Sequence, residues 1–295
     1  MKRKGVVLAF VLLSSVFFGT VSGLWGDDFS SGNVSPSDFI FFNSPYGLDW
    51  ALDGCGVGMS TGIFVLGRVL YNSKPNPSVT EIKNLNRDNI FIVDRELMTD
   101  YSPYVGWASD IAKDISVSLP VLLIASSLWQ YYRLRGDLSG NLPFGQRGYS
   151  AENALAERLT EIVIMYYESL MLALGIKDSL KGLVTRFRPY AYGSVLSVEE
   201  IASNPDSTCS FPSGHTTAAF VGAVFLSTVF SDYYPDSPLK LPVWLGSLML
   251  AATTGALRIA SGNHFLSDVV AGAVIGAVSV IGVRYLHVTI KFPPK

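Results

Sequence analysis

Long apolar stretches without charges constrain this chain more than any other feature. The stretch from Ile115 to Tyr132 has no charged residue and is close to the shortest length that crosses a bilayer as a helix. Ser150 can cap a second helix that reaches Ile176, and further apolar helices are expected at residues 213–231, 241–257 and 264–283. Since no segment alternates polar and apolar residues as a strand does, we expect an all-α fold. It would be a helical bundle of about six long apolar helices, embedded in a membrane.

The composition fits a bilayer as solvent and excludes other classes of protein. Of 295 residues, 49% are hydrophobic and 16% are charged, against about 25% charged in soluble domains, and the mean hydropathy is +0.34. Such a chain is too apolar to be disordered or fibrous. The 24 acidic residues outnumber the 22 basic ones, and no basic run alternates with aromatic residues. We therefore expect no nucleic acid as a partner.

The chain begins with the pattern of an export signal. Three basic residues follow Met1, then a long uncharged apolar stretch, then small residues before the first acidic pair. We interpret residues 1–23 as a signal peptide or an uncleaved signal anchor. Residues 24–114 would form an exported N-terminal region.

That region contains one Gly-rich apolar helix, expected at residues 49–71. Gly58 and Gly62 are spaced so that another helix could pack closely against them. The uncharged core of the segment, from Gly54 to Gly67, is too short to cross a membrane. We therefore expect the segment to be interfacial or re-entrant.

The two cysteines, Cys55 and Cys209, are too few for a disulfide framework or a Cys-rich zinc module. We interpret both as small buried hydrophobic residues. The sequence leaves open whether they form a disulfide.

Two segments in the second half place basic residues and a histidine at helix ends. Lys181 and Arg188 are seven residues apart, so on a helix they would share one face, and Pro189 ends the helical pattern. The second segment, Ser210 to His215, opens an apolar helix whose free backbone N–H groups would attract a phosphate. Each segment alone would be an ordinary solvated helix end.

A third segment joins an arginine, a histidine and a carboxylate. Arg258 and His264 have the wrong spacing for one helical face, but the Ser-Gly-Asn between them can end one helix and turn into the next. His264 and Asp268 are one turn apart, so the carboxylate can hold one ring nitrogen and leave the other free to attack. Because a carboxylate costs several kcal/mol to desolvate, the presence of Asp268 in an apolar helix indicates that it has a specific role.

Together the patterns K-x6-R-P, P-S-G-H and R-x5-H-x3-D resemble the type-2 phosphatidic acid phosphatase superfamily, which also contains bacterial acid phosphatases and vanadium haloperoxidases. The motifs run from Lys181 to Asp268, and the resemblance makes residues 115–287 the corresponding helical domain. One position departs from the family: Leu257 stands where a serine commonly precedes the third-motif arginine. The departure concerns a supporting hydrogen bond and not the reaction itself.

The resemblance implies a metal-independent phosphatase that acts through a phosphohistidine. His264 would attack phosphorus, Asp268 would stabilise its imidazolium, and His215 would protonate the leaving oxygen and later activate water. The phosphate oxygens would be bound by Lys181, Arg188 and Arg258 and by the N–H groups of Ser213 and Gly214. No cofactor or metal is expected, since three histidines without an H-E-x-x-H pattern disfavour a zinc hydrolase.

Three residues near the motifs receive no role in this scheme. Arg186 matches no motif position. We interpret His287 as structural or exposed, and Glu168 as pairing within the bundle.

A membrane-embedded enzyme would hydrolyse a lipid phosphate or diphosphate monoester, with membrane lipids as its neighbours. The alternatives are a soluble periplasmic non-specific acid phosphatase, a vanadate-dependent haloperoxidase, or a non-catalytic membrane protein on the same scaffold. The sequence fixes neither the lipid nor the oligomeric state.

Charge distribution suggests which side of the membrane the motifs face. Suppose that the four helices at residues 150–176, 213–231, 241–257 and 264–283 span the membrane. The motifs then lie on one side, and the other side carries the basic residues Arg133, Arg135, Arg147, Lys240, Arg284, Lys291 and Lys295. The positive-inside rule then predicts an enzyme of the bacterial cell envelope, in the inner membrane, with its active site facing the periplasm. A spanning segment at residues 49–71 behind a cleaved leader would reverse this orientation.

Overall fold

A computed structural model describes residues 44–137 and 151–290 of the chain. The predicted leader at residues 1–23 and the arm that follows it, up to residue 43, lie outside the described residues. All regular secondary structure in the described part is helical, apart from one isolated β-bridge between Arg186 and Cys209. This confirms the all-α prediction.

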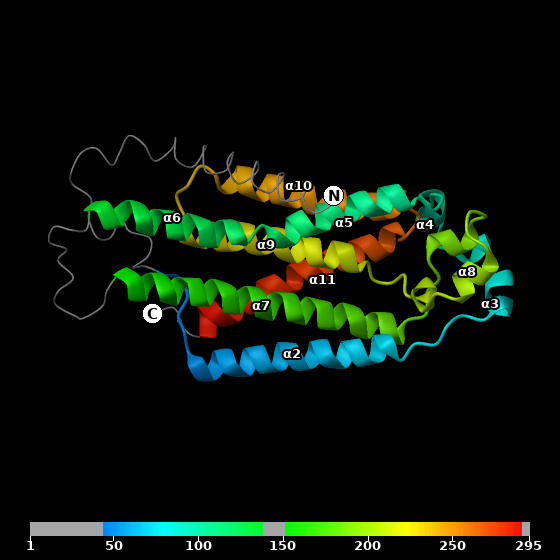
Figure 1. Cartoon of the computed structure of the whole chain (residues 1–295), viewed down its shortest axis with the longest axis horizontal. Helices are drawn as coiled ribbons and strands as arrows, with labels where there is room; N and C mark the ends of the chain where they lie inside the picture. Colours follow the sequence, from blue (N-terminus) through cyan, green and yellow to red (C-terminus); the bar gives the residue numbers. More distant parts are fainter. Residues whose placement is uncertain (1–43, 138–150, 291–295) are drawn as a thin grey trace.

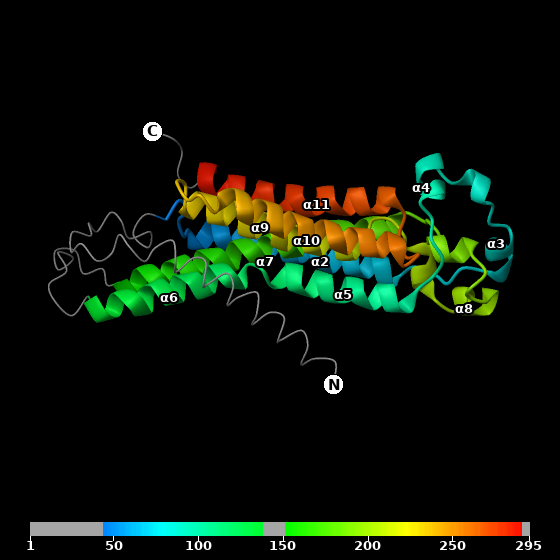
Figure 2. The ribbon, with the colours of Figure 1, turned by 90° about the horizontal axis from the view of Figure 1, so that it is seen from above.

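The helices form an elongated bundle with a small cap at one end (Figures 1 and 2). The long helices are α2 (Trp50–Asn72), α5 (Pro103–Ser118), α6 (Val121–Asp137), α7 (Ala151–Leu183), α9 (Gly214–Tyr233), α10 (Lys240–Ala260) and α11 (Leu266–Tyr285), and a π-helical turn, η8 (Leu286–Ile290), follows α11. The cap contains α3 (Val79–Lys83), η4 (Arg87–Asn89), α4 (Ile92–Glu96), η6 (Pro189–Tyr192), α8 (Val198–Ala202) and η7 (Pro205–Thr208). We call the end that carries these short elements the capped end, and the other the opposite end.

Helix α9 forms the core of the bundle. Helices α5, α7, α10 and α11 all pack against it, and its apolar residues Val221, Phe225 and Val229 are buried. The amino end of α9 lies at the capped end, next to the carboxyl ends of α7 and α10 and the beginning of α11 (Figure 1). The fold therefore gathers the three sequence motifs at one end of the bundle.

Helix α2 corrects two expectations for residues 49–71. It is a 23-residue helix that is long and apolar enough to cross a membrane, so the segment is not too short to span, as its uncharged core suggested. It lies beside α7 and runs in the same direction, with Gly56 against Glu168 and Gly67 against Gly175. The predicted Gly58 and Gly62 face away from the bundle, since a Cβ at either position would have no other atom within 4 Å.

Helices α5 and α6 correct the prediction of one helix from Ile115 to Tyr132. The helix breaks at Leu119 and Pro120, and the two parts are bent by 41°. Proline lacks the N–H that a continuous helix needs and disfavours helical geometry in the residue before it. The first part also begins earlier than expected, at Pro103, where the Ser102 side chain caps it.

Five helices in the described part are long and apolar enough to span a membrane. They are α2, residues 155–183 of α7, α9, α10, and α11 continued to Val288, and the bent pair α5 and α6 makes a sixth if it counts as one span. These helices fit the prediction of a membrane protein. The connection from α2 to α5, which contains Lys74, Lys83, Arg87 and Arg95, lies at the capped end (Figure 1).

Both cysteines are free thiols. Cys209 is buried as expected, but Cys55 is exposed on the outer face of α2. The interpretation of Cys55 as a buried residue is therefore wrong, and the pair forms no disulfide.

Candidate active site

His264 lies at the capped end, in the short connection between α10 and α11, and its side chain is 1% exposed. Its Nε2 is 3.2 Å from Nη1 of Arg188. An arginine can only donate, so Nε2 accepts and the ring proton is on Nδ1. The imidazole thus presents a lone pair to a guanidinium that could also hold a phosphate oxygen.

Asp268 lies next to the other ring nitrogen of His264, Nδ1. Its Oδ2 is 3.5 Å from His264 Nδ1, although Nδ1 makes no hydrogen bond among the described residues. The carboxylate accepts hydrogen bonds from Ser210 Oγ at 2.6 Å and from the Phe265 backbone N–H at 2.9 Å. The helix begins at Leu266, so His264 precedes α11 and does not share a helical face with Asp268 as predicted. The two side chains meet because Asp268 caps the helix from its first turn.

Three buried cations surround His264, from three different segments. Lys181 lies in the last turn of α7, Arg258 lies in the last turn of α10, and Arg188 lies in the connection after α7. Helix α7 ends at Leu183, so Lys181 and Arg188 are not on one helix as the spacing suggested. They converge because residues 186–188 turn back alongside residues 207–210 through backbone hydrogen bonds.

Each cation is held differently. The Lys181 ammonium donates to the backbone carbonyl of Cys209. The Arg188 guanidinium donates to the side-chain carboxylate and the backbone carbonyl of Asp206, and to the backbone carbonyl of Asn263. Arg258 donates to Ser109 Oγ at 3.2 Å, and its Nε has no partner among the described residues. Of these three cations, only Arg188 forms an ion pair with a described residue, so the three together carry more positive charge than their direct partners neutralise.

Burial and this positive surrounding keep His264 neutral. Burial lowers the pKa of His264 well below its ordinary value, and Arg188, Lys181, Arg258 and His215 lower it further. A neutral imidazole keeps the lone pair that a nucleophile needs. The charge that hinders protonation of His264 is also the charge that would attract a phosphate.

The amino end of α9 is built differently from the prediction. Ser213 is its N-cap, but the Ser213 backbone N–H donates to the carbonyl of Asp268 at 3.0 Å. That N–H is therefore already paired in this structure, and its role in binding phosphate stays a prediction. Gly214 is the first residue of α9, where an N–H has no partner within the helix. A Cβ at Gly214 would stand 2.9 Å from the Lys177 side chain, which packs across this turn.

His215, in the first turn of α9, has a partner that the sequence did not indicate. Its Nε2 is 2.6 Å from Oδ1 of Asp110, on α5. The two are the more accessible members of the site, with side chains 28% and 50% exposed. Asp110 was missed because nothing in the sequence links α5 to the amino end of α9.

Arg186 is a second residue that the motif pattern missed. It donates to Asp268 Oδ1 at 2.5 Å, to Ser267 Oγ, and through its other nitrogen to Asp94. Asp94, in α4, also accepts from the backbone and hydroxyl of Ser267. Burial raises the pKa of Asp94, but the hydrogen bonds from Ser267 and Arg186 outweigh it and leave this pKa below its ordinary value.

A sequence signal for Arg186 existed. The residue directly before a proline, here Arg188, is pushed toward extended backbone, and where an extended segment continues, every second side chain lies on the same face. Arg186 and Arg188, which precede Pro189, therefore both point toward the beginning of α11. Arg188 reaches His264 and Arg186 reaches the carboxylate behind it.

A small cavity of about 110 Å³ lies in the cap beside the site. Its lining includes Asp206, which holds Arg188, and Asn263, which precedes His264. In the described part of the chain, the side chains that could together hold a metal ion lie elsewhere, at Asp53, Glu168 and His287. The site at the capped end thus has the composition of an anion site with two imidazoles.

Comparison with known proteins agrees with this reading of the geometry. Residues 162–292 match the model of the PAP2 superfamily. A PA-phosphatase related-family protein of Dictyostelium discoideum is 25% identical over 244 residues, which cover 80% of this chain and 77% of that protein. No solved structure matches. All three motifs fall inside residues 162–292, the part of the chain that matches the PAP2 superfamily.

Proposed function

We propose that this protein is a metal-independent phosphatase that hydrolyses a lipid phosphate or diphosphate monoester through a phosphohistidine. The PAP2 domain supports a phosphatase. The observation that carries the finer proposal is the meeting of three buried cations with a buried, neutral imidazole at one end of an apolar bundle.

The proposed reaction has two steps at His264 Nε2. The imidazole attacks phosphorus, a P–N bond forms, the ester P–O bond breaks, and His215 gives a proton to the leaving oxygen. Water then attacks phosphorus while His215 takes one of its protons, the P–N bond breaks, and phosphate leaves. Lys181, Arg188 and Arg258 stabilise charge on the phosphoryl oxygens, which is the main source of rate enhancement in phosphoryl transfer.

The surface around the capped end supports a substrate that lies in a membrane. Tyr104 and Trp107, on the first two turns of α5, are exposed, and Phe91 in front of α4 is 66% exposed. Tyrosine and tryptophan concentrate where a membrane meets water. Tyr104 and Trp107 precede Asp110 on α5. Asp110, the partner of His215, therefore lies close to the level at which the membrane would meet water. A lipid headgroup would reach the site there.

We propose further that the capped end faces the non-cytoplasmic side. The beginning of α10, with Lys240, and the end of α11, with Arg284, lie at the opposite end (Figure 1), and basic residues favour the cytoplasm. Because α2 crosses, its beginning lies at the same end of the bundle as η8 (Figure 1). Both would then be cytoplasmic, which contradicts the prediction that the leader exports the segment behind it.

Phosphate release by the full chain in detergent or lipid vesicles tests the function. The substrates are a panel of lipid phosphates and diphosphates beside soluble esters, assayed with a chelator present. We expect release from the lipids, and none from His264→Ala even when that variant melts at the wild-type temperature. Asp114→Asn, an exposed acid on α5, is the matched control and should keep its activity.

The other outcomes each contradict a part of the proposal. Activity restricted to soluble esters would contradict the lipid substrate, and undiminished turnover by His264→Ala would contradict the nucleophile. Bromide oxidation by peroxide that appears only with vanadate would assign the site to haloperoxidase chemistry instead. No release from any substrate would contradict a phosphatase.

A further inference from the structure

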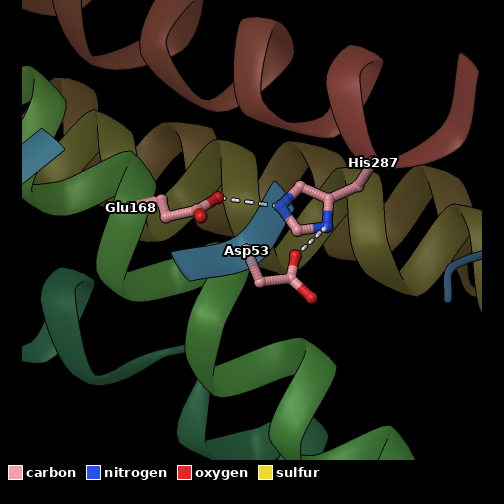
Figure 3. Close-up of side chains that lie close together, drawn as sticks. All are labelled: Asp53, Glu168 and His287. Carbon is pink, nitrogen blue, oxygen red and sulfur yellow. Dashed lines mark hydrogen bonds and ion pairs between the residues drawn. The ribbon is translucent and has the colours of Figure 1, made fainter. Parts of the chain in front are cut away.

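A second buried polar cluster lies in the other half of the bundle, outside every sequence motif. It consists of Asp53 on α2, Glu168 on α7 and His287 in the turn after α11 (Figure 3). Each of the three is at most 5% exposed. Glu168 is 13 positions before Lys181 on α7, which is about 20 Å along a helix axis, so the cluster is separate from the candidate active site.

The imidazole of His287 lies between the two carboxylates. Its Nε2 is 2.8 Å from Glu168 Oε2, and its Nδ1 is 3.7 Å from Asp53 Oδ1. His287 is thus buried and not at the surface, while Glu168 pairs within the bundle as predicted. The cluster joins three separate helical segments. Two of them, the beginning of α2 and the turn η8, lie near the two ends of the described chain, at the same end of the bundle (Figure 1).

The Glu168 carboxylate is only partly satisfied by these contacts. Oε2 accepts from His287, but Oε1 is buried and has no hydrogen-bond partner among the described residues. A Cβ at Gly56 would lie 2.3 Å from Oε1, so α2 leaves room for this oxygen but offers it no donor. An unpaired buried carboxylate oxygen is costly in an apolar bundle. A positively charged ligand would remove that cost.

The donor atoms suit a small divalent ion. One ligand atom from each residue can be chosen so that all three lie within 4.8 Å of one another. The ligand atoms around a tetrahedral zinc ion, at about 2.0–2.2 Å from the metal, are roughly 3.3–3.5 Å apart, so small side-chain rotations would suffice. Two carboxylates with one imidazole are ligands that transition-metal ions accept, whereas Mg²⁺ prefers oxygen alone.

We propose that Asp53, Glu168 and His287 bind a divalent transition-metal ion, of which Zn²⁺ is the representative, and that the ion clamps α2 and the end of α11 to α7. Its role is structural. The ion would replace the hydrogen bond between His287 and Glu168 and give Glu168 Oε1 a partner. This site is independent of the proposed phosphatase reaction, which uses no metal.

The test is a titration of the full chain, purified without a histidine tag and stripped with chelator, with Zn²⁺, Mn²⁺ or Mg²⁺. Calorimetry and elemental analysis should show one Zn²⁺ per chain, and no Mg²⁺ at the same concentrations. Glu168→Gln and His287→Gln should weaken Zn²⁺ binding by about tenfold or more. Glu161→Gln, a second buried acid on α7, and His215→Gln, at the candidate active site, should bind as the wild type does.

Thermal unfolding gives a second measurement, in which each protein is compared with itself, with and without Zn²⁺. Zn²⁺ at about 100 times its Kd should raise the wild-type Tm by roughly 5–10 °C and leave the His287→Gln Tm unchanged. Wild-type protein that binds no Zn²⁺ overturns the proposal, and the cluster is then an imidazole held between two carboxylates. Equal Zn²⁺ binding by His287→Gln and His215→Gln overturns it too. Phosphate release by the stripped protein below its Tm reports separately on the proposed function.

Discussion

The contact between α2 and α7 depends on glycines that the sequence pattern did not single out. A Cβ at Gly67 would stand 2.3 Å from the carbonyl oxygen of Gly175 and 3.0 Å from the backbone nitrogen of Ser179. Both atoms belong to the backbone of α7, so neither can rotate away. Gly67→Ala must therefore push the two helices apart. At Gly62, in the same helix, a Cβ meets no atom within 4 Å.

The two substitutions should have opposite signs. An extra methyl group in a close contact costs about 1–3 kcal/mol, while replacing glycine by alanine inside a helix gains roughly 0.5–1 kcal/mol. We expect Gly67→Ala to lose about 1–2 kcal/mol of unfolding free energy and Gly62→Ala to gain about 0.5–1 kcal/mol. At about 2–4 °C per kcal/mol, Tm should fall by roughly 2–8 °C in the first variant and rise by roughly 1–4 °C in the second.

Thermal unfolding of both variants in one detergent, followed by circular dichroism, measures this difference. A Gly67→Ala protein as stable as the wild type would refute the packing described for α2 and α7. A Gly62→Ala protein that melts below Gly67→Ala would show instead that the face with Gly58 and Gly62 makes the contact, as the Gly-xxx-Gly spacing suggested.

Three further predictions concern the site and the orientation. Asp110→Asn should lower kcat about tenfold or more with little change in KM, because His215 loses the partner that orients it; equal losses in Asp114→Asn would contradict this. Because burial lowers the pKa of His264 well below its ordinary value, only the unfolded chain takes up this proton as the pH falls below about 6.5, so folding weakens there. Between pH 7.5 and 5.5 the wild type should lose more unfolding free energy than His264→Asn, up to about 1.4 kcal/mol, and equal losses would place an ordinary pKa at His264. In a chain with Cys55 and Cys209 replaced by alanine, an impermeant thiol reagent applied to cells should label Glu199→Cys, in the cap, and not Asp236→Cys, between α9 and α10; the reverse labelling would place the capped end in the cytoplasm.

The sequence predicted the bundle well wherever apolar runs and caps determined it. The expected helices at 213–231, 241–257 and 264–283 correspond to α9, α10 and α11 within a few residues. The prediction for residues 49–71 failed because the count of uncharged residues stopped at Arg68, whose guanidinium pairs with Asp178 on α7 and stays half exposed. A charge that can reach the helix end or a partner does not end a membrane span.

The motifs predicted which side chains belong to the site but not how they are held. Periodicity placed Lys181 and Arg188 on one helix, whereas the chain leaves the helix after Leu183 and returns by pairing with residues 207–210. Such long-range pairing has no local signature. The same holds for Asp110, which reaches His215 only because α5 packs against α9. The local sequence pattern therefore identifies the motif residues of the site, whereas their partners, such as Asp110, are brought to it by tertiary contacts.

The two buried polar clusters of this bundle are unbalanced in opposite directions. At the capped end Lys181 and Arg258 have no ion pair in the described part of the chain, and in the other half Glu168 has an unpartnered oxygen. Charges about 20 Å apart interact by only about 0.8 kcal/mol at an effective dielectric constant of 20, against about 4 kcal/mol at 4 Å. The two clusters therefore cannot neutralise each other through the bundle. A phosphate ester at the cationic end and a metal ion at the acidic one would satisfy both, and the two ligands can be tested separately because so little energy couples their sites.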